Sequence, residues 1–180
     1  MKLILYILFI TLNCYSFDKY QLTAGLQYNI PEVKNTQKQN KPTGEFGLIA
    51  RTSINSNLDF RTGLVIKRSF TFFETQSLTS EYTFDYVSLP LTIANNITET
   101  MTIIYGASVS ALISNECVIK ENQSLCDDFE PNSTIASIII GAGERIDDDF
   151  EVEVYLESSV MELAKDINLT SISFNFLYNL

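Results

Sequence analysis

The sequence contains no histidine and no tryptophan among its 180 residues. Without histidine there can be no Ser-His-Asp triad, no Cys-His pair and no metal centre held by imidazoles. Basic residues are also scarce, with 12 Lys and Arg against 22 Asp and Glu and a formal net charge of −10. This balance argues against nucleic acid as a partner, because phosphate binding requires clustered basic side chains. We therefore expect no enzyme, no catalytic residues, no cofactor and no metal site.

The first 16 residues, MKLILYILFITLNCYS, have the organisation of a secretory signal peptide. One lysine precedes an apolar run from Leu3 to Leu12, and the small residues Cys14 and Ser16 occupy positions −3 and −1 of a cleavage after Ser16. The run is too short to span a bilayer. An alternative is lipoprotein processing at Cys14, which its neighbours fit poorly. We expect export and a single mature domain over residues 17–180.

Two cysteines remain after cleavage, Cys117 and Cys126, with eight residues between them in a polar stretch. In an oxidising compartment an even pair at this spacing predicts a disulfide that pins a loop. The number and spacing fit neither a CxxC redox motif nor a four-cysteine zinc site.

Apolar and polar residues alternate with a period of two along most of the mature chain. Such a pattern predicts half-buried β-strands with one apolar face and one small or polar face. No segment has convincing helical periodicity. The eight predicted strands are Tyr20–Tyr28, Phe46–Ile54, Leu58–Lys67, Tyr82–Ala94, Met101–Ser114, Thr134–Arg145, Phe150–Val160 and Asn168–Leu180.

The predicted connections alternate in length along the chain. Longer loops at one end and short turns at the other are typical of bacterial outer-membrane barrels. We therefore predict an all-β fold, an eight-stranded antiparallel up-and-down transmembrane β-barrel. The longer connections are Asn29–Glu45, Glu74–Glu81, Asn115–Ser133 and Met161–Ile167, and the short turns are Asn55–Asn57, Asn95–Thr100 and Ile146–Asp149.

The polarity of the two faces distinguishes a membrane barrel from a soluble one. The non-apolar face is rich in glycine and serine, which suits the narrow interior of an eight-stranded barrel. Aromatic residues near the strand ends suit girdles at the membrane interfaces. The alternative is a soluble periplasmic lipocalin-like barrel that binds a small apolar ligand. The aromatic residues concerned are Tyr20, Tyr28, Phe70, Phe72, Tyr82, Phe84, Tyr86 and Tyr178.

Several segments resemble the small bacterial outer-membrane barrel family of the OmpX-like and PorT-like type. They are FDYVSLPLTIANNI (84–97), IIYGASVSALIS (103–114), IIIGAGERI (138–146) and the C-terminal SISFNFLYNL. The resemblance implies an outer-membrane location and contact with its lipid. It also implies recognition of the last strand by the barrel-assembly machinery, through Phe174, Phe176, Tyr178 and Leu180, the last standing where phenylalanine is usual. Because activities differ within the family, it implies location more firmly than function.

The polar face of the predicted barrel carries charges of both signs. Carboxylates that share a face repel one another unless cations lie among them, and a lone buried charge is costly. We therefore predict an ionic network that fills the lumen, with a gated ion pore or a carboxylate acid/base pair as the functional alternative. The predicted members are Arg51, Asp59, Arg61, Lys67, Asp85, Glu151, Glu153 and Glu157.

These features together predict a structural, surface-interaction or envelope-integrity role for a monomeric barrel. Any extracellular partner would contact the loops Asn29–Glu45 and Asn115–Ser133. The second loop contains several acidic residues, which we interpret as a solvated acidic surface because their spacing does not match an EF-hand. An accessory barrel for secretion or transport, suggested by the PorT-like relatives, is a further alternative.

Overall fold

The computed structural model describes residues 17–32, 37–39, 41–75, 78–119, 131–163 and 168–180. The predicted signal peptide and Cys126 lie outside these residues, so cleavage after Ser16, processing at Cys14 and the disulfide remain predictions. Within the described residues, no helix has the length and apolar character needed to cross a membrane.

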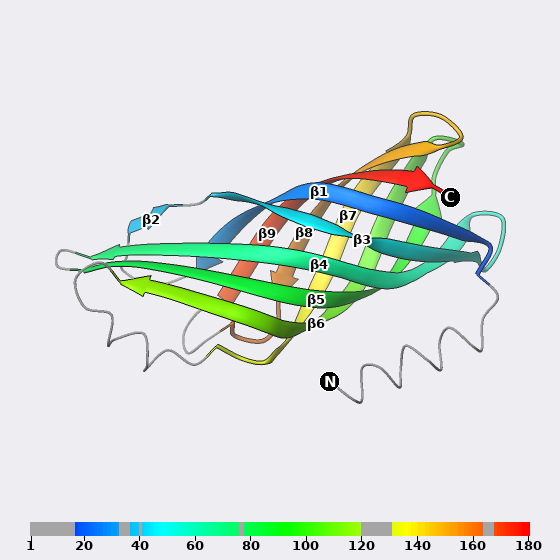
Figure 1. The fold of residues 1–180 in the computed structure, drawn as a ribbon. Helices are drawn as coiled ribbons and strands as arrows, with labels where there is room; N and C mark the ends of the chain where they lie inside the picture. Colours follow the sequence, from blue (N-terminus) through cyan, green and yellow to red (C-terminus); the bar gives the residue numbers. More distant parts are fainter. Residues whose placement is uncertain (1–16, 33–36, 40, 76–77, 120–130, 164–167) are drawn as a thin grey trace.

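The described chain forms a closed antiparallel β-barrel (Figure 1). Each of eight strands pairs with two neighbours in the order β4-β3-β1-β9-β8-β7-β6-β5, and pairing between β4 and β5 closes the ring. A short strand, β2 (Gln37–Gln39), adds to the long-loop end of β4. The prediction of an eight-stranded all-β barrel is confirmed. The barrel strands are β1 (Lys19–Glu32), β3 (Pro42–Ser53), β4 (Leu58–Thr75), β5 (Leu78–Asn96), β6 (Met101–Ile119), β7 (Thr134–Arg145), β8 (Phe150–Ser159) and β9 (Asn168–Asn179).

Apolar side chains cover the outside of the barrel and polar side chains lie within it. Leu26 is 63% exposed and Phe46 is 57% exposed, whereas Glu153 inside the barrel is 1% exposed. A soluble barrel requires the opposite polarity, so the lipocalin-like alternative is wrong. On β6 the outward apolar face runs from Ile103 to Ile113. Ten residue steps at the usual strand rise and tilt cover about 25 Å along the barrel axis, the height of a membrane-facing apolar band.

Three strands continue beyond the others at the long-loop end. β4 reaches Thr75 and β5 begins at Leu78, so the predicted loop Glu74–Glu81 is wrong. These strands pair as far as Thr75 opposite Leu78, and Figure 1 shows β4, β5 and β6 extending together past the ring. β6 continues to Ile119, which places Cys117 in a strand and not in a loop. Backbone pairing outside the membrane does not require an alternating pattern, which explains the underestimated lengths.

The interpretation of the aromatic residues needs two corrections. Phe70 of β4 is buried, with Lys41 Nζ 4.5 Å from its ring centroid, so it is not an exposed girdle residue. Tyr82, Phe84 and Tyr86 do not belong to an outer girdle, because their side chains are buried in a cluster with Ile135 and Leu163. They stand at even positions of β5, like Ser88, and share its inward face. Tyr20, Tyr28 and Tyr178 are exposed on the outside of the barrel, as girdle residues should be.

Candidate functional site

The lumen is the candidate site, because the charged side chains of four strands meet there. At the short-turn end, Arg51 of β3 is the centre of the network. Its Nε and Nη2 donate to Asp59 Oδ2 at 2.9 and 2.7 Å, and its Nη1 donates to Glu151 Oε1 at 3.1 Å. Arg145 of β7 lies at the rim, with Nε 3.6 Å from the same Glu151 oxygen. One guanidinium thus satisfies carboxylates from β4 and β8, since a planar fork binds two acceptors at once.

Above this cluster, Arg61 of β4 and Glu153 of β8 form a bidentate ion pair. The two N–O distances are 2.6 and 3.0 Å, and both side chains are almost completely buried. β4 and β8 are not neighbours in the ring, so the pair crosses the lumen. Paired hydrogen bonds of this kind offset the large desolvation cost of burying both charges.

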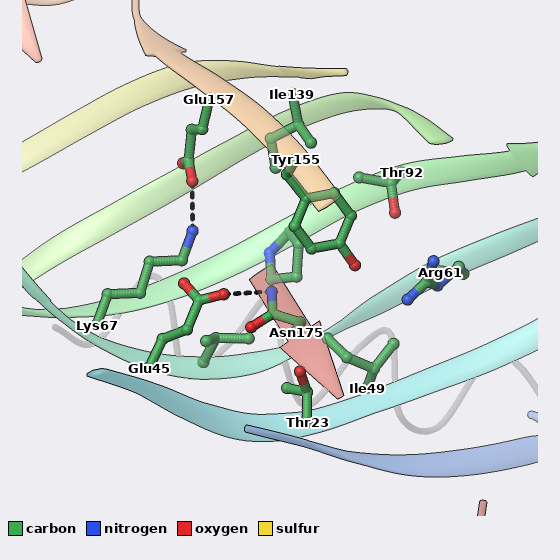
Figure 2. Close-up of a pocket in the computed structure, with 12 residues that line it drawn as sticks. Thr23, Glu45, Ile49, Arg61, Lys67, Thr92, Ile139, Tyr155, Glu157 and Asn175 are labelled. Atoms are coloured by element: carbon green, nitrogen blue, oxygen red, sulfur yellow. Dashed lines mark hydrogen bonds and ion pairs between the residues drawn. The ribbon is translucent and has the colours of Figure 1, made fainter. Parts of the chain in front are cut away.

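A second pair crosses the lumen closer to the long-loop end. Lys67 of β4 donates to Glu157 Oε2 of β8, and Ser108 Oγ of β6 donates to Glu157 Oε1 at 2.6 Å. Figure 2 shows this pair beside a hydrogen bond between Glu45 and Asn175. The inward faces of β4 and β8 therefore pair cation with carboxylate at two levels, with Gly63 and Val65 between the two cations and Tyr155 between the two carboxylates.

The sequence interpretation missed Glu45 and Asn175, which also face the lumen. Asn175 Nδ2 of β9 donates to Glu45 Oε1 of β3, although β1 lies between these strands. Gly25 of β1 is paired with both residues and makes this possible, because a Cβ there would stand 1.6 Å from Asn175 Oδ1. Glu45 has the same parity as Arg51, so continuing the alternation from Arg51 would have placed it in the lumen.

Seven of the eight predicted network residues lie in this lumen, and Asp85 does not. Asp85 lies on the outer side of β5, where Arg68 Nε and Nη2 donate to its two oxygens at 2.7 and 3.0 Å. It shares the parity of the outward-facing Leu91, which is why it cannot point inward. The pair lies above the apolar band, and the hydrogen bonds from Arg68 hold the pKa of the Asp85 carboxyl below its ordinary value.

The lumen contains small separate cavities. One is lined by Glu45, Arg61 and Asn175 and offers about 40 Å³ of space to water, and another beneath Tyr86 offers about 30 Å³. Each has room for about two or three water molecules. Lys67 and Glu157 line both cavities and stand between them. Buried oxygens of Glu45, Asn175 and Tyr86 have no protein partner, and cavity waters would satisfy them.

The two ends of the lumen differ. At the short-turn end lies an open polar vestibule of about 780 Å³, with Arg51 and Asp59 among the residues that line it. At the long-loop end, Leu163 packs fully buried against the cluster of Tyr82, Phe84 and Tyr86. The backbone N–H of Asn132 donates to the Leu163 carbonyl at 2.8 Å, which ties the segment before β7 to the segment that follows β8.

These groups neutralise one another and fill the lumen. Histidine, the most frequent acid/base residue, is absent, and the paired carboxylates already have cation partners. Among the described residues, no three Cys, Asp or Glu side chains are grouped so that they could hold a metal ion. On β9, Phe174, Phe176 and Tyr178 are exposed on the outer face and Leu180 follows them. Their recognition during assembly stays a prediction.

Comparisons with known proteins identify the fold. No protein-family model and no curated protein sequence matches the chain. Among solved structures, the crystal structure of Ail, the attachment invasion locus protein of Yersinia pestis, matches with a TM-score of 0.54 and 15% identity, over 92% of this chain and all of that one. Neisserial surface protein A matches with a TM-score of 0.53 and 10% identity, over 88% and 96% of the two chains. Ail in a phospholipid bilayer nanodisc matches at 0.52 and 16% identity, over 90% and 99%.

The fold is therefore that of the OmpX-like eight-stranded outer-membrane barrels. Closed pairing leaves no backbone edge for lipid to meet, and the apolar band provides the surface that hydrocarbon requires. The chain is an outer-membrane β-barrel protein located in the bacterial outer membrane. At these identities the likeness describes the fold, and the particular role has to be argued from this chain's own residues.

Proposed function

We propose that this barrel conducts nothing, catalyses nothing and acts as a monomer at the cell surface, in contacts with other molecules or in envelope integrity. The observation that supports this most is the pair of ion bridges across the lumen, Arg61–Glu153 and Lys67–Glu157. An open pore would have to break both bridges and expose their charges to water. The cluster around Leu163 at the long-loop end supports the same proposal, because it leaves less room for hydrated ions or a secreted chain to pass.

The extension of β4, β5 and β6 supports a surface contact. β6 pairs with β7 only as far as Ala111 opposite Thr134. Beyond that point, the segment 113–116 of β6 has no strand partner on the side of β7 among the described residues. An unpaired edge can accept a strand from another protein, because its N–H and C=O groups remain available. The partner that suits this edge is a protein with an extended segment.

The charge of the long-loop end favours a protein over a sulfated sugar. Ail was also solved in complex with the heparin analogue sucrose octasulfate, in a structure that matches this chain at a TM-score of 0.51. In this chain the segments 31–44, 68–85, 116–133 and 160–167 carry eleven Asp and Glu against six Lys and Arg. An acidic surface repels sulfates, so we expect this barrel to bind no heparin analogue.

A shortened hairpin tests the proposed surface role. Residues 72–81 are replaced by Asn-Gly, a two-residue turn that joins Thr71 to its partner Tyr82. The barrel should still fractionate with outer membranes and migrate differently before and after heating. Adhesion or aggregation of expressing cells should fall to the level of cells lacking the protein. The surface-contact role is wrong if the shortened protein retains full adhesion. It is also wrong if a deletion strain shows no adhesion defect and the shortened protein restores its detergent resistance. Envelope integrity would then be the remaining role.

A further inference from the structure

A groove on the outside of the barrel lies at the upper edge of the apolar band. It has a volume of about 490 Å³ and is lined by residues of β3, β4, β5 and β6. Its lower part is apolar and strongly exposed, with Phe46, Ile66 and Ile113 each more than half exposed. Its upper part contains Arg68, Asp85 and Ser114. The groove thus changes from apolar to charged along the membrane normal, as a lipid molecule does.

The groove exists because one position in an outward row has no side chain. Gly44 of β3 is paired with Leu26 of β1. On its other side it lies beside Arg68 of β4, one position beyond the cross-strand pair Glu45–Lys67. A Cβ placed on Gly44 would meet nothing nearer than 4.0 Å. A bulge in β6 next to Asp85 adds Ile113 to the opposite wall. The hollow therefore follows from the backbone and from one glycine.

The charged end of the groove has hydrogen-bonding capacity left over. Arg68 uses two of its five N–H groups on Asp85 and makes no further hydrogen bond among the described residues, while 61% of its side chain is exposed. Asp85 accepts one more bond, from Ser114 Oγ at 2.9 Å. Glu116 lies opposite Thr83, on the same face as Asp85, and is exposed. A cation and two carboxylates thus face the headgroup region side by side.

We propose that this groove binds an outer-leaflet lipid whose headgroup carries both a phosphate and a primary ammonium. The remaining N–H groups of Arg68 donate to the phosphate, and the ammonium donates to Asp85 and Glu116. An acyl chain lies over Phe46, Ile66 and Ile113. A purely anionic headgroup fits less well, because the two carboxylates would repel it. This inference rests on the outer-membrane location and is independent of the proposed surface role.

Lipid retention by the purified barrel tests the proposal. The protein is extracted in mild detergent, incubated with phosphatidylethanolamine, phosphatidylglycerol or phosphatidylcholine, and examined by native mass spectrometry. Phosphatidylethanolamine should be retained best, because phosphatidylglycerol lacks the ammonium and the choline group has no N–H donor. Filling the groove with Gly44→Leu, or removing the cation with Arg68→Gln, should weaken retention by about tenfold, the equivalent of one charge-assisted hydrogen bond.

Matched variants keep the test decisive. Glu144→Gln changes one exposed charge near the short-turn end and should leave retention unchanged. Heat-modifiable migration shows that each variant is folded, so a loss of binding cannot come from misfolding. Equal retention of the three lipids, or unchanged retention by both Gly44→Leu and Arg68→Gln, would overturn the proposal. A preference for phosphatidylglycerol would also overturn it and would indicate simple attraction to a cation.

Discussion

Lys67 of β4 and Glu157 of β8 form an ion pair across the lumen, and the same two side chains line the cavities on either side of it. The pair therefore has two consequences. The pairing offsets the cost of burying both charges in the low-dielectric interior. The two side chains also separate the water molecules of one cavity from those of the other. Closure of the lumen and stability of the barrel depend on the same contact.

Removing one member of this pair should destabilise the barrel strongly. Lys67→Met leaves the Glu157 carboxylate buried without its cation, which we expect to cost about 3–5 kcal/mol. The double variant Lys67→Met with Glu157→Met should regain most of that loss, because no unpaired charge is left. Unfolding in urea, followed by circular dichroism because the chain has no tryptophan, measures both values. Equal destabilisation in the single and double variants would show that the pairing contributes nothing.

The outward face can be tested at Leu64. This residue lies on the outer side of β4, with Arg68 four residues above it and Phe60 four residues below it. Leu64→Arg should cost about 2–4 kcal/mol, as expected for arginine near the bilayer midplane, whereas Ile54→Arg at the short-turn end should cost about 0–1 kcal/mol. Unfolding from lipid vesicles gives both values. Similar costs at the two sites would mean that the band does not meet hydrocarbon.

Two glycines in neighbouring strands make a matched pair. Gly25→Ala places a methyl group against Asn175 and should break its hydrogen bond to Glu45, at a cost of about 1–3 kcal/mol for the unsatisfied buried groups. Gly44→Ala points into open space and should be close to neutral. Thermal unfolding of both variants in one detergent checks the difference. If Gly25→Ala leaves the thermal stability unchanged, the hydrogen bond between Asn175 and Glu45 does not depend on the absence of a side chain at Gly25.

The proposed closure of the lumen at the long-loop end depends on Leu163. Leu163→Ala should cost about 2–5 kcal/mol, because it leaves a cavity among Tyr82, Phe84 and Tyr86. Met161→Ala, two residues away and 45% exposed, should change stability by no more than about 0.5 kcal/mol. Protease digestion of intact cells gives a second measurement, since a loosened β8–β9 connection should be cut faster. Identical digestion of the Leu163 variant and the wild type would contradict the proposed closure.

The strands within the membrane could be predicted from the sequence, because lipid on one side and a packed lumen on the other enforce a strict period of two. Thr134–Arg145 was predicted with the bounds that β7 has in the structure. The extension of β4 and β5 could not be predicted in this way, since water on one or both faces removes that constraint. The two residues between Thr75 and Leu78 in the sequence include no Gly, Pro, Asn or Asp that would have indicated a turn.

The lumen residues could be predicted wherever parity was applied consistently. Arg61 and Glu153 followed from the faces of their own strands, although their pairing across the ring depends on the stagger of the barrel. The charge of Asp85 suggests the lumen, whereas its parity on β5 places it outside. The cluster of Tyr82, Phe84 and Tyr86 was assigned to a girdle for its aromatic character although its parity places it inside. For these residues the type of side chain suggests the wrong face of the barrel, whereas the alternation along β5 gives the correct one.

Conductance across a planar bilayer tests the closed lumen most directly. Wild-type protein incorporated into the bilayer should give no steady current steps, because Arg61–Glu153, Lys67–Glu157 and the cluster around Leu163 close the path. A variant with Arg61, Lys67 and Leu163 replaced by serine, provided that it folds, serves as the control and should conduct. Steady open conductance by the wild type would contradict the account of a filled and closed barrel.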